Sequence, residues 1–270
     1  MTGDTSRAVP TWGGSLAVHG LLPSRDARIP RFVLVHGAAN AARVWTYWQP
    51  ALAAAGVASY AVDLRGHGDS APTDLSGTSM HDYADDVCAV LEQLARPAIV
   101  VGWSMGGLAA MLAAERGGVA GCVGLAPSVP ALRVDASIRL RYGEFGSEEY
   151  GITSMDPARQ PAMPDLDGEE REVALASLCR ESRYARDERA AGVVIESLPC
   201  PLLIVTGTAD AQWPRSRYNE LHLPADYRSA EGASHWGLVL NKRVLAALVP
   251  EVLTWARSTV FGESAVVTER

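Results

Sequence analysis

A serine between two glycines is the strongest chemical signal in the sequence. Gly102-Trp-Ser-Met-Gly106 has the pattern Gly-x-Ser-x-Gly, which can hold a nucleophilic serine in a sharp turn between a strand and a helix. The apolar residues 98–101 precede the motif and an alanine-rich stretch follows it, so the surrounding sequence predicts that context. A helix N-terminus also favours developing negative charge near Ser104. The alternative is an ordinary serine that caps a helix.

A serine hydroxyl becomes a nucleophile when a base takes its proton and an acid orients that base. Two histidines follow Ser104. His235 lies in a loop of small residues between the last expected strand and the last expected helix, whereas the surroundings of His222 are more typical of a surface segment, so we favour His235 as the base. Asp210 follows the apolar run 202–206, where its carboxylate can hold the imidazole in one tautomer. The expected catalytic residues are therefore Ser104, Asp210 and His235.

Short apolar runs that alternate with longer amphipathic stretches must position these residues. Strand runs are expected at 31–35, 58–62, 98–101, 119–125, 201–205 and, more weakly, 227–229. Helices are expected at 44–55, 80–95, 104–116 and 236–257. Continuous apolar strands alternating with helices predict an α/β protein whose mostly parallel sheet is covered on both faces. Ligands of such sheets bind at the carboxyl ends of the strands, where the three candidate residues lie.

The alternation stops between residues 129 and 198. This stretch is charged and helix-prone, and it contains 9 Arg and 14 Asp or Glu, so it carries −5 of the net charge of −7. We expect a helical lid inserted between two strands, whose charges either form a solvated face or disfavour strongly anionic substrates.

Composition excludes several classes of protein. The chain has 270 residues, of which 48% are hydrophobic and 20% charged, as expected of a folded globular protein. Its net negative charge argues against a nucleic-acid partner, and its apolar runs are too short to span a membrane. The four cysteines have no zinc-ligand spacing, so no metal or other cofactor is expected. A polar start without an apolar leader predicts a cytoplasmic location.

Several of these motifs together, in this order, resemble the α/β-hydrolase fold superfamily over about residues 14–260. His36-Gly37-Ala38 is similar to the oxyanion-hole loop of that family, residues 63–70 to its turn after the fourth strand, and residues 102–107 to its nucleophile turn. The resemblance implies a sheet of about seven to eight strands, and an oxyanion hole made by the backbone N–H groups of Ala38 and Met105. Relatives with an aspartate nucleophile, the haloalkane dehalogenases and epoxide hydrolases, are disfavoured because the chain has Ser104 there.

The domain organisation expected from this resemblance is a hydrolase core at 1–128 and 199–262, a lid at 129–198 and a flexible tail at 263–270. Trp103, Trp213 and Trp236 each neighbour a site residue, and they either line the pocket or belong to the core. Asn40 and Trp45 are expected near the pocket entrance. The other polar residues of the two loops, among them His36, Asp63, Arg65 and His67, are interpreted as structural turn residues.

The resemblance implies a lidded serine hydrolase that cleaves carboxylic esters of small, largely apolar substrates through an acyl-enzyme, without a cofactor. Lactone hydrolysis, C–C bond hydrolysis and cofactor-free perhydrolase activity would use the same triad. A small-molecule receptor on the same fold is the alternative from another class. The expected partner is a small ester-like molecule, and the sequence predicts no particular oligomeric state.

Overall fold

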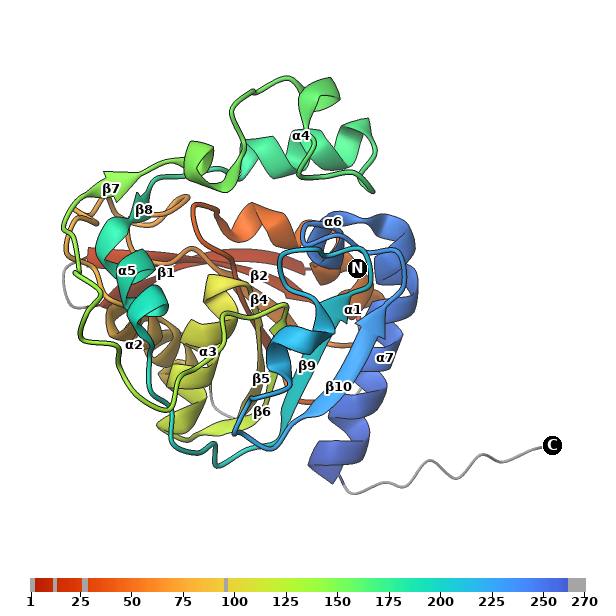
Figure 1. Ribbon diagram of the computed structural model, residues 1–270. Coiled ribbons are helices and arrows are strands. Elements are labelled where there is room, and N and C mark those ends of the chain that lie inside the picture. Colours follow the sequence, from red (N-terminus) through yellow and green to blue (C-terminus); the bar gives the residue numbers. More distant parts are fainter. Residues whose placement is uncertain (1–2, 12–13, 26–28, 95–96, 262–270) are drawn as a thin grey trace.

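The computed structural model describes residues 3–11, 14–25, 29–94 and 97–261, and its centre is an eight-stranded sheet (Figure 1). The strands lie in the order β1-β2-β4-β3-β5-β6-β9-β10. The six strands from β4 to β10 in this order are parallel to their neighbours, whereas β1, β2 and β4 pair antiparallel. Their bounds are β1 Gly3–Thr11, β2 Gly14–Leu22, β3 Phe32–Val35, β4 Ser59–Val62, β5 Ala98–Trp103, β6 Val119–Leu125, β9 Leu202–Gly207 and β10 Asp226–Ala230. The predicted mostly parallel sheet of seven to eight strands is confirmed.

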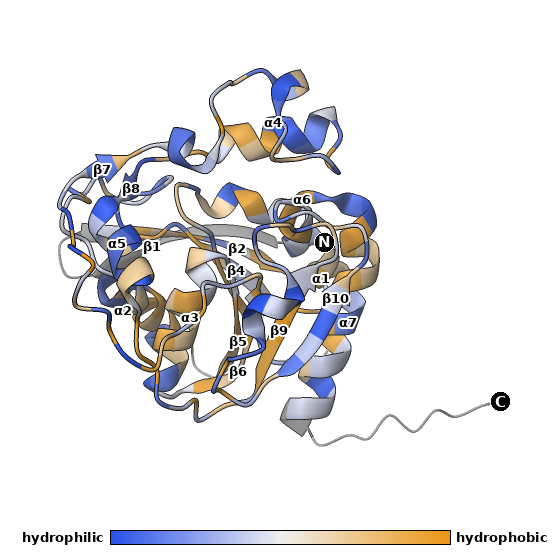
Figure 2. Ribbon diagram, in the orientation of Figure 1, coloured by the Kyte–Doolittle hydropathy of each residue, from blue (hydrophilic) through white to orange (hydrophobic). Residues whose placement is uncertain are grey.

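Helices cover both faces of the sheet, because strand residues alternate between two buried clusters. Phe32 and Leu34 of β3 pack into one cluster with α1 (Trp48–Ala54) and α7 (Lys242–Phe261). Val33 and Val35 pack into the other with α2 (Met80–Glu92) and α3 (Met105–Glu115). Figure 2 shows the hydrophobic colouring concentrated on β9 and α3 in the middle of the molecule. Strands buried on both faces are the reason why these runs are continuously apolar.

The β1–β2 hairpin is absent from the sequence-based expectation, which began at residue 31. It adds two antiparallel strands to the edge of the sheet beyond β4. The sequence pattern from which a strand could have been predicted lies in β2, where Leu16 and Val18 are buried and alternate with less buried neighbours. This period of two is the pattern of a strand with one covered face.

Two predicted helices are divided in the structure. The run 44–55 forms the 3₁₀ helix η1 (Ala42–Trp45) and then α1, and the run 236–257 forms α6 (Gly237–Leu240) and α7. Asn241 separates the last two, because its backbone is extended and its side-chain oxygen accepts from the N–H groups of Arg243 and Val244. It therefore acts as the N-cap of α7. The predicted end of the second helix at residue 95, and the tail 263–270, lie outside the described residues.

We call residues 129–198, which lie between β6 and β9, the insertion. It consists of β7 (Glu144–Phe145), the 3₁₀ helices η2 (Ser147–Tyr150) and η3 (Pro157–Arg159), α4 (Gly168–Ala176), β8 (Glu181–Ser182) and α5 (Arg183–Ala191). Figure 1 shows α4 and the green segments around it set apart above the sheet. Long stretches of the insertion have no regular structure, and both backbone and side-chain contacts attach it to the core. Among the described residues, no helix is both long and apolar enough to cross a membrane.

Candidate active site

A cavity of about 380 Å³ lies at the carboxyl ends of the parallel strands, between the core and the insertion. Segments after β3, β5, β9 and β10 form its core side, and four segments of the insertion form the other. The core contributes Ala38, Ala39, Asn40, Trp103, Ser104, Ala209, Asp210, Ala211, Gln212, Trp213, Ser234, His235 and Trp236; the insertion contributes Ser147, Tyr150, Ile152, Pro161, Ala162, Pro164, Leu178 and Arg189. The structure thus brings the three candidate catalytic residues to one cavity.

Ser104 occupies a strained turn between β5 and α3. Its backbone has φ 54° and ψ −119°, an unfavourable conformation for a residue with a Cβ atom. The two glycines of the motif permit it: a Cβ on Gly102 would lie 2.1 Å from the carbonyl oxygen of Gly106, and one on Gly106 would lie 2.2 Å from that of His36. The turn presents Ser104, which is partly exposed, to the cavity at the N-terminus of α3.

His235 and Asp210 form a direct pair beside Ser104. Nδ1 of His235 lies 2.7 Å from Oδ2 of Asp210, and Oδ1 of Asp210 accepts from the backbone N–H groups of Gln212 and Trp213. Burial favours the neutral acid, but the hydrogen bonds from His235 and the two N–H groups outweigh it and lower the pKa of Asp210. An ionised Asp210 keeps the proton of His235 on Nδ1 and leaves Nε2 as the basic nitrogen.

Neither the Ser104 hydroxyl nor Nε2 of His235 has a hydrogen-bond partner within the described part of the chain. Both side chains line the same cavity. Such contacts are often long or misaligned without a substrate and tighten when one is bound. A hydroxyl, an imidazole and a carboxylate thus lie around one cavity, and such a set of groups can in principle activate a serine.

Three tryptophans surround the His235 imidazole. The Trp103 ring centre lies 5.1 Å from that of His235, and Trp213 stacks over His235 with ring centres 6.3 Å apart. The Trp103 indole N–H donates to the His235 carbonyl at 3.0 Å, and Trp236 packs against Trp103. All three line the cavity, and Trp103 and Trp236 also belong to the buried core. Lining the pocket and packing in the core, which the sequence left as alternatives, are therefore combined in these residues.

Two backbone N–H groups next to Ser104 are without a partner in the described residues: those of Ala38, in the loop after β3, and of Met105, the first residue of α3. The Met105 side chain is buried and packs in the core. The Ala38 carbonyl accepts from the Asn40 side chain at 2.7 Å, which fixes this peptide loop beside the cavity. Asn40 lines the cavity as expected, but Trp45 does not: it is fully buried in the core, where it packs edge-on against Trp48.

Residues 177–182 of the insertion hold this loop from the other side. Ala39 has φ 56°, a strained conformation for alanine, and both of its peptide groups are fixed: its N–H donates to Oε2 of Glu181 at 2.9 Å, and its carbonyl accepts from the Cys179 N–H. The Ser177 hydroxyl donates to the Asn40 side chain. Sequence reasoning missed these contacts because nothing in the local pattern links two segments 140 residues apart.

Glu181 is a fully buried carboxylate behind the Ala38–Asn40 loop. Besides Ala39 it accepts from the Tyr83 hydroxyl at 2.5 Å, and Nε2 of His67 lies 3.5 Å away. Burial alone would favour the neutral acid, but His67 and Tyr83 outweigh it, together with Ala39, and lower the pKa of Glu181 to about 2. For His67 burial opposes protonation, and the Glu181 carboxylate overcomes it and raises the pKa of His67.

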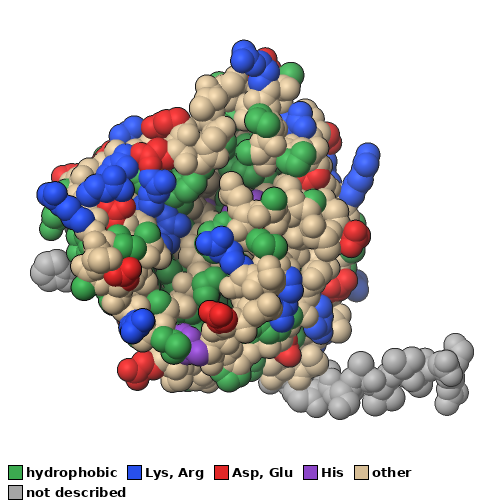
Figure 3. All heavy atoms as spheres, viewed as in Figure 1, with side chains coloured by type: hydrophobic (Ala, Val, Ile, Leu, Met, Phe, Trp, Pro, Cys, Tyr) green, Lys and Arg blue, Asp and Glu red, His purple; other side chains and the backbone are tan. Residues whose placement is uncertain are grey.

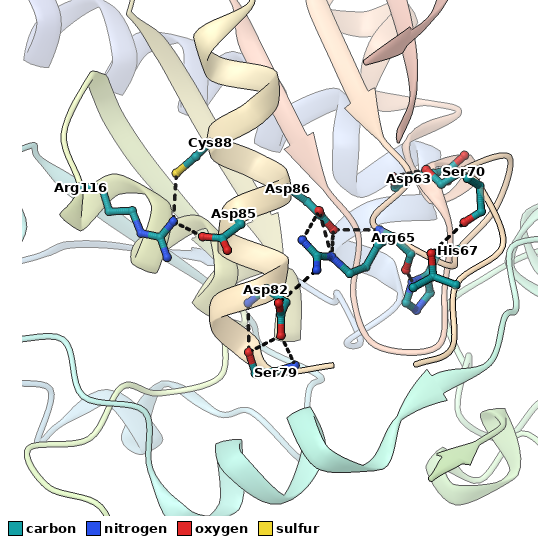
Figure 4. Close-up of polar contacts among 12 residues, drawn as sticks. Asp63, Arg65, His67, Ser70, Ser79, Asp82, Asp85, Asp86, Cys88 and Arg116 are labelled. Atoms are coloured by element: carbon teal, nitrogen blue, oxygen red, sulfur yellow. Dashed lines mark hydrogen bonds and ion pairs between the residues drawn. The ribbon is translucent and has the colours of Figure 1, made fainter. Parts of the chain in front are cut away.

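The turn after β4 has a structural role. The Arg65 guanidinium forms ion pairs with Asp82 and Asp86 of α2 (Figure 4). Asp63 accepts from the backbone N–H groups of Ala42 and Asp69, and so joins the turn to η1. None of these side chains lines the cavity among the described residues.

His19, Asp63 and Asp69 form the one group of three possible metal ligands within the described ranges. It lies outside the cavity, and the carboxylate of Asp63 is already used by backbone N–H groups and by His19. These contacts link β2, the turn after β4 and η1.

Comparisons with known proteins agree with the fold described above. The family model described as "Alpha/beta hydrolase family" matches residues 32–248, about four-fifths of the chain. No curated protein sequence matches. Among solved structures, the chain is similar to the esterase RhEst1 from Rhodococcus sp. ECU1013, with 25% identity and a TM-score of 0.66 over 95% of this chain and 99% of that one.

Two further solved structures share the fold. Carboxylesterase CesB (YbfK) from Bacillus subtilis has 17% identity and a TM-score of 0.68, over 97% of this chain and 93% of that one. Epoxide hydrolase A from Mycobacterium thermoresistibile has 22% identity and a TM-score of 0.65, over 92% and 98%. At sequence identities this low, the similarity to these two structures shows a shared fold and nothing more specific. With a family model that spans β3 to α7 and an architecture common to all three structures, the chain belongs to the alpha/beta hydrolase family.

Proposed function

We propose that the protein is a serine hydrolase that cleaves carboxylic esters of small substrates through an acyl-enzyme. One observation carries the proposal: a strained serine at a helix N-terminus faces the same cavity as a histidine paired to a buried carboxylate. A receptor that only binds a ligand has no need to hold the imidazole in one tautomer or to maintain strain at Ser104. The esterases among similar structures are consistent with it.

In the first half-reaction Oγ of Ser104 attacks the ester carbonyl carbon while Nε2 of His235 takes the hydroxyl proton. The carbonyl oxygen becomes an oxyanion, for which the N–H groups of Ala38 and Met105 are the available donors. Asp210 stabilises the imidazolium through Nδ1–H. His235 then gives its proton to the leaving alkoxide, and the C–O bond breaks to leave an acyl group on Ser104.

In the second half-reaction a water molecule replaces the alcohol. His235 takes a proton from the water, the hydroxide attacks the acyl carbon, and the same two N–H groups receive the second oxyanion. The intermediate expels Ser104, which regains its proton from His235. The insertion closes one side of the cavity and serves as a lid that positions the substrate and limits the access of water.

The test compares the wild type with Ser104→Ala on p-nitrophenyl acetate and butyrate, together with intact mass after a fluorophosphonate probe. We expect hydrolysis and a single label in the wild type, and loss of both in the variant. Labelling without ester turnover would redirect the search to lactones or diketones. If the wild type neither labels nor hydrolyses, the serine-hydrolase proposal is wrong and a binding role takes its place.

A further inference from the structure

Arg189 of α5 is the one charged side chain that the insertion contributes to the cavity, as far as the chain is described. The other insertion residues in the lining are neutral, and several are apolar, such as Ile152 and Leu178. On the core side, Asp210 is the only carboxylate among the described residues of the lining, and it is paired with His235. Figure 3 shows Lys and Arg side chains gathered on the α5 side of the hollow between insertion and core.

The guanidinium of Arg189 has donors to spare. Nη2 donates to the Tyr150 hydroxyl at 2.9 Å and Nη1 reaches the Ser128 hydroxyl at a long 3.4 Å, both neutral groups. Nε is buried and has no hydrogen-bond partner, and Arg189 forms no ion pair with any described residue. A guanidinium carries five N–H groups, and leaving a charged donor unpaired away from water is costly.

The nearest carboxylate does not supply the missing partner. Burial opposes the charge of Arg189, and Tyr150 and Glu181 outweigh it and raise the pKa of Arg189, so Glu181 acts on it through space. The oxygens of Glu181, however, are taken by the N–H groups of Ala39 and Ser182, the Tyr83 hydroxyl and the nearby His67. Arg189 therefore remains a cation whose matching anion is absent from the cavity wall.

Several other arginines of the insertion form ion pairs. Arg183 and Arg186, on the same helix, both contact Glu149, and Arg141 makes a two-point contact with Asp187. The carboxylates of the insertion are absent from the described lining of the cavity, to which the insertion contributes only the charge of Arg189. The net charge of −5 in this segment is therefore not the charge that a substrate meets there.

We propose that Arg189 binds a carboxylate of the substrate, so that the preferred ester has an apolar part against the tryptophans and an anionic end against α5. The inference rests on the proposed function and narrows its substrate class. A planar guanidinium whose two Nη groups contact only neutral hydroxyls matches a carboxylate in a two-point contact. A phosphate dianion would call for more donors than one guanidinium and two hydroxyls.

The experiment measures kcat/KM for matched ester pairs. The p-nitrophenyl half-ester of glutarate is compared with p-nitrophenyl pentanoate, which places the carboxylate on the acyl side. The second pair, 4-acetoxybenzoate and phenyl acetate, places it on the alcohol side. We expect the wild type to prefer the anionic member of one pair, and Arg189→Met to reduce that preference by about 10- to 100-fold, mainly through KM.

Arg189→Lys keeps the charge but loses the planar fork, and we expect it to fall between the wild type and Arg189→Met. The matched control is Arg180→Met, an exposed arginine outside the cavity, which should leave both ratios unchanged. Melting temperatures show whether each variant is folded. If Arg189→Met lowers both members of each pair equally, or changes neither ratio, the carboxylate site is refuted while ester hydrolysis stands.

Binding is tested separately from turnover, by titration calorimetry of glutarate against Ser104→Ala and against Ser104→Ala with Arg189→Met. Binding to the first protein but not to the second supports the site even if no ester is hydrolysed, in which case only the proposed function fails. Absence of any anionic preference together with absence of glutarate binding overturns the inference.

Discussion

The two sides of the cavity are built differently. On the core side the candidate reacting groups follow strands of one sheet, and backbone geometry places them: Ser104 by a glycine-flanked turn, and Asp210 by two backbone N–H donors. On the insertion side the elements are short, and buried polar contacts position them. Glu181 holds the peptide of Ala39, and Asp165 accepts from the N–H of Ser234, next to His235.

This difference separates two tasks. The core presents the candidate reacting groups, because the sheet fixes where its strands end. The insertion holds two of the core loops in place and adds the only unpaired charge seen in the described cavity wall. Substitutions in the core should therefore change the chemical step most, and substitutions in the insertion should change positioning, stability and choice of substrate.

The largest effect is expected at the core pair. Asp210→Asn keeps the shape of the side chain but no longer favours the tautomer with its proton on Nδ1, so kcat/KM for p-nitrophenyl acetate should fall about 10⁴-fold. Melting temperature should change little. Asp74→Asn, at an exposed loop position, is the matched control. A loss of less than tenfold would mean that His235 does not depend on Asp210.

The next effect tests whether the insertion positions the core. Glu181→Gln removes the charge that balances His67 and weakens the contact to Ala39, so we expect kcat to fall about 10- to 100-fold with a smaller change in KM. The free energy of unfolding should fall by about 3 kcal/mol. Tyr83→Phe removes one donor to Glu181 and retains the ring. It should lower both kcat and the free energy of unfolding, each by less than Glu181→Gln does. Unchanged kcat in a destabilised Glu181→Gln would reduce Glu181 to a structural role.

The free energy of unfolding at acid pH should also depend on Glu181. The pKa of Glu181 is about 2 in the folded protein and 4.5 ordinarily, so the unfolded chain takes up its proton first as the pH falls. The contribution of Glu181 is complete above about pH 4.5 and is lost as the pH falls toward 2. Between pH 6 and pH 3 the stability gap between the wild type and Glu181→Gln should shrink by about 2 kcal/mol, as measured by urea unfolding. A gap that stays constant over this range would contradict the lowered pKa.

The smallest effects are expected at exposed ion pairs in either region. Arg116 pairs with Asp85 on the surface of the core (Figure 4), and Arg180 pairs with Glu144 on the insertion. Because water screens such pairs, Arg116→Met and Arg180→Met should each change the free energy of unfolding by less than about 1 kcal/mol. Arg65→Met is the contrasting variant, since it leaves the buried carboxylate of Asp86 without its ion-pair partner. It should lower the free energy of unfolding by about 3 kcal/mol. Equal losses in all three would show that burial does not govern these pairs.

The sequence predicted the parallel part of the sheet because its strands are buried on both faces, which leaves uninterrupted apolar runs. It also pointed to Ser104 and Asp210, which each follow such a run, and to His235, which follows the weaker strand β10, because the sheet brings the ends of its strands together. The β1–β2 hairpin escaped notice because its signal is a weaker alternation near the start of the chain. The last helix is divided at Asn241, whose side chain caps α7 and also donates to the carbonyl of Asp165, 76 residues earlier.

Arg189 and Glu181 could not be recognised from the sequence for a different reason. Both occur in an ordinary charged stretch, Glu181-Ser-Arg-Tyr-Ala-Arg-Asp-Glu-Arg189, whose pattern is typical of a solvated helix. Only the folded chain shows that one of these charges is buried behind a backbone peptide and that another faces the cavity without a partner. A count of charges along the segment describes its outer surface and not its inner one.

The contacts of residues 177–182 also set the boundaries for any exchange of parts between members of this family. A chimera in which a foreign segment replaces all of 129–198 would keep Ser104, Asp210 and His235, yet lose the groups that fix Ala39 and Asn40. The Ser177 hydroxyl, the Cys179 N–H and the Glu181 carboxylate belong functionally with the core, although they lie within the inserted sequence. The part of the insertion that can be exchanged is therefore the chain around Asp165 and residues 177–182. A graft should retain these residues and replace the rest.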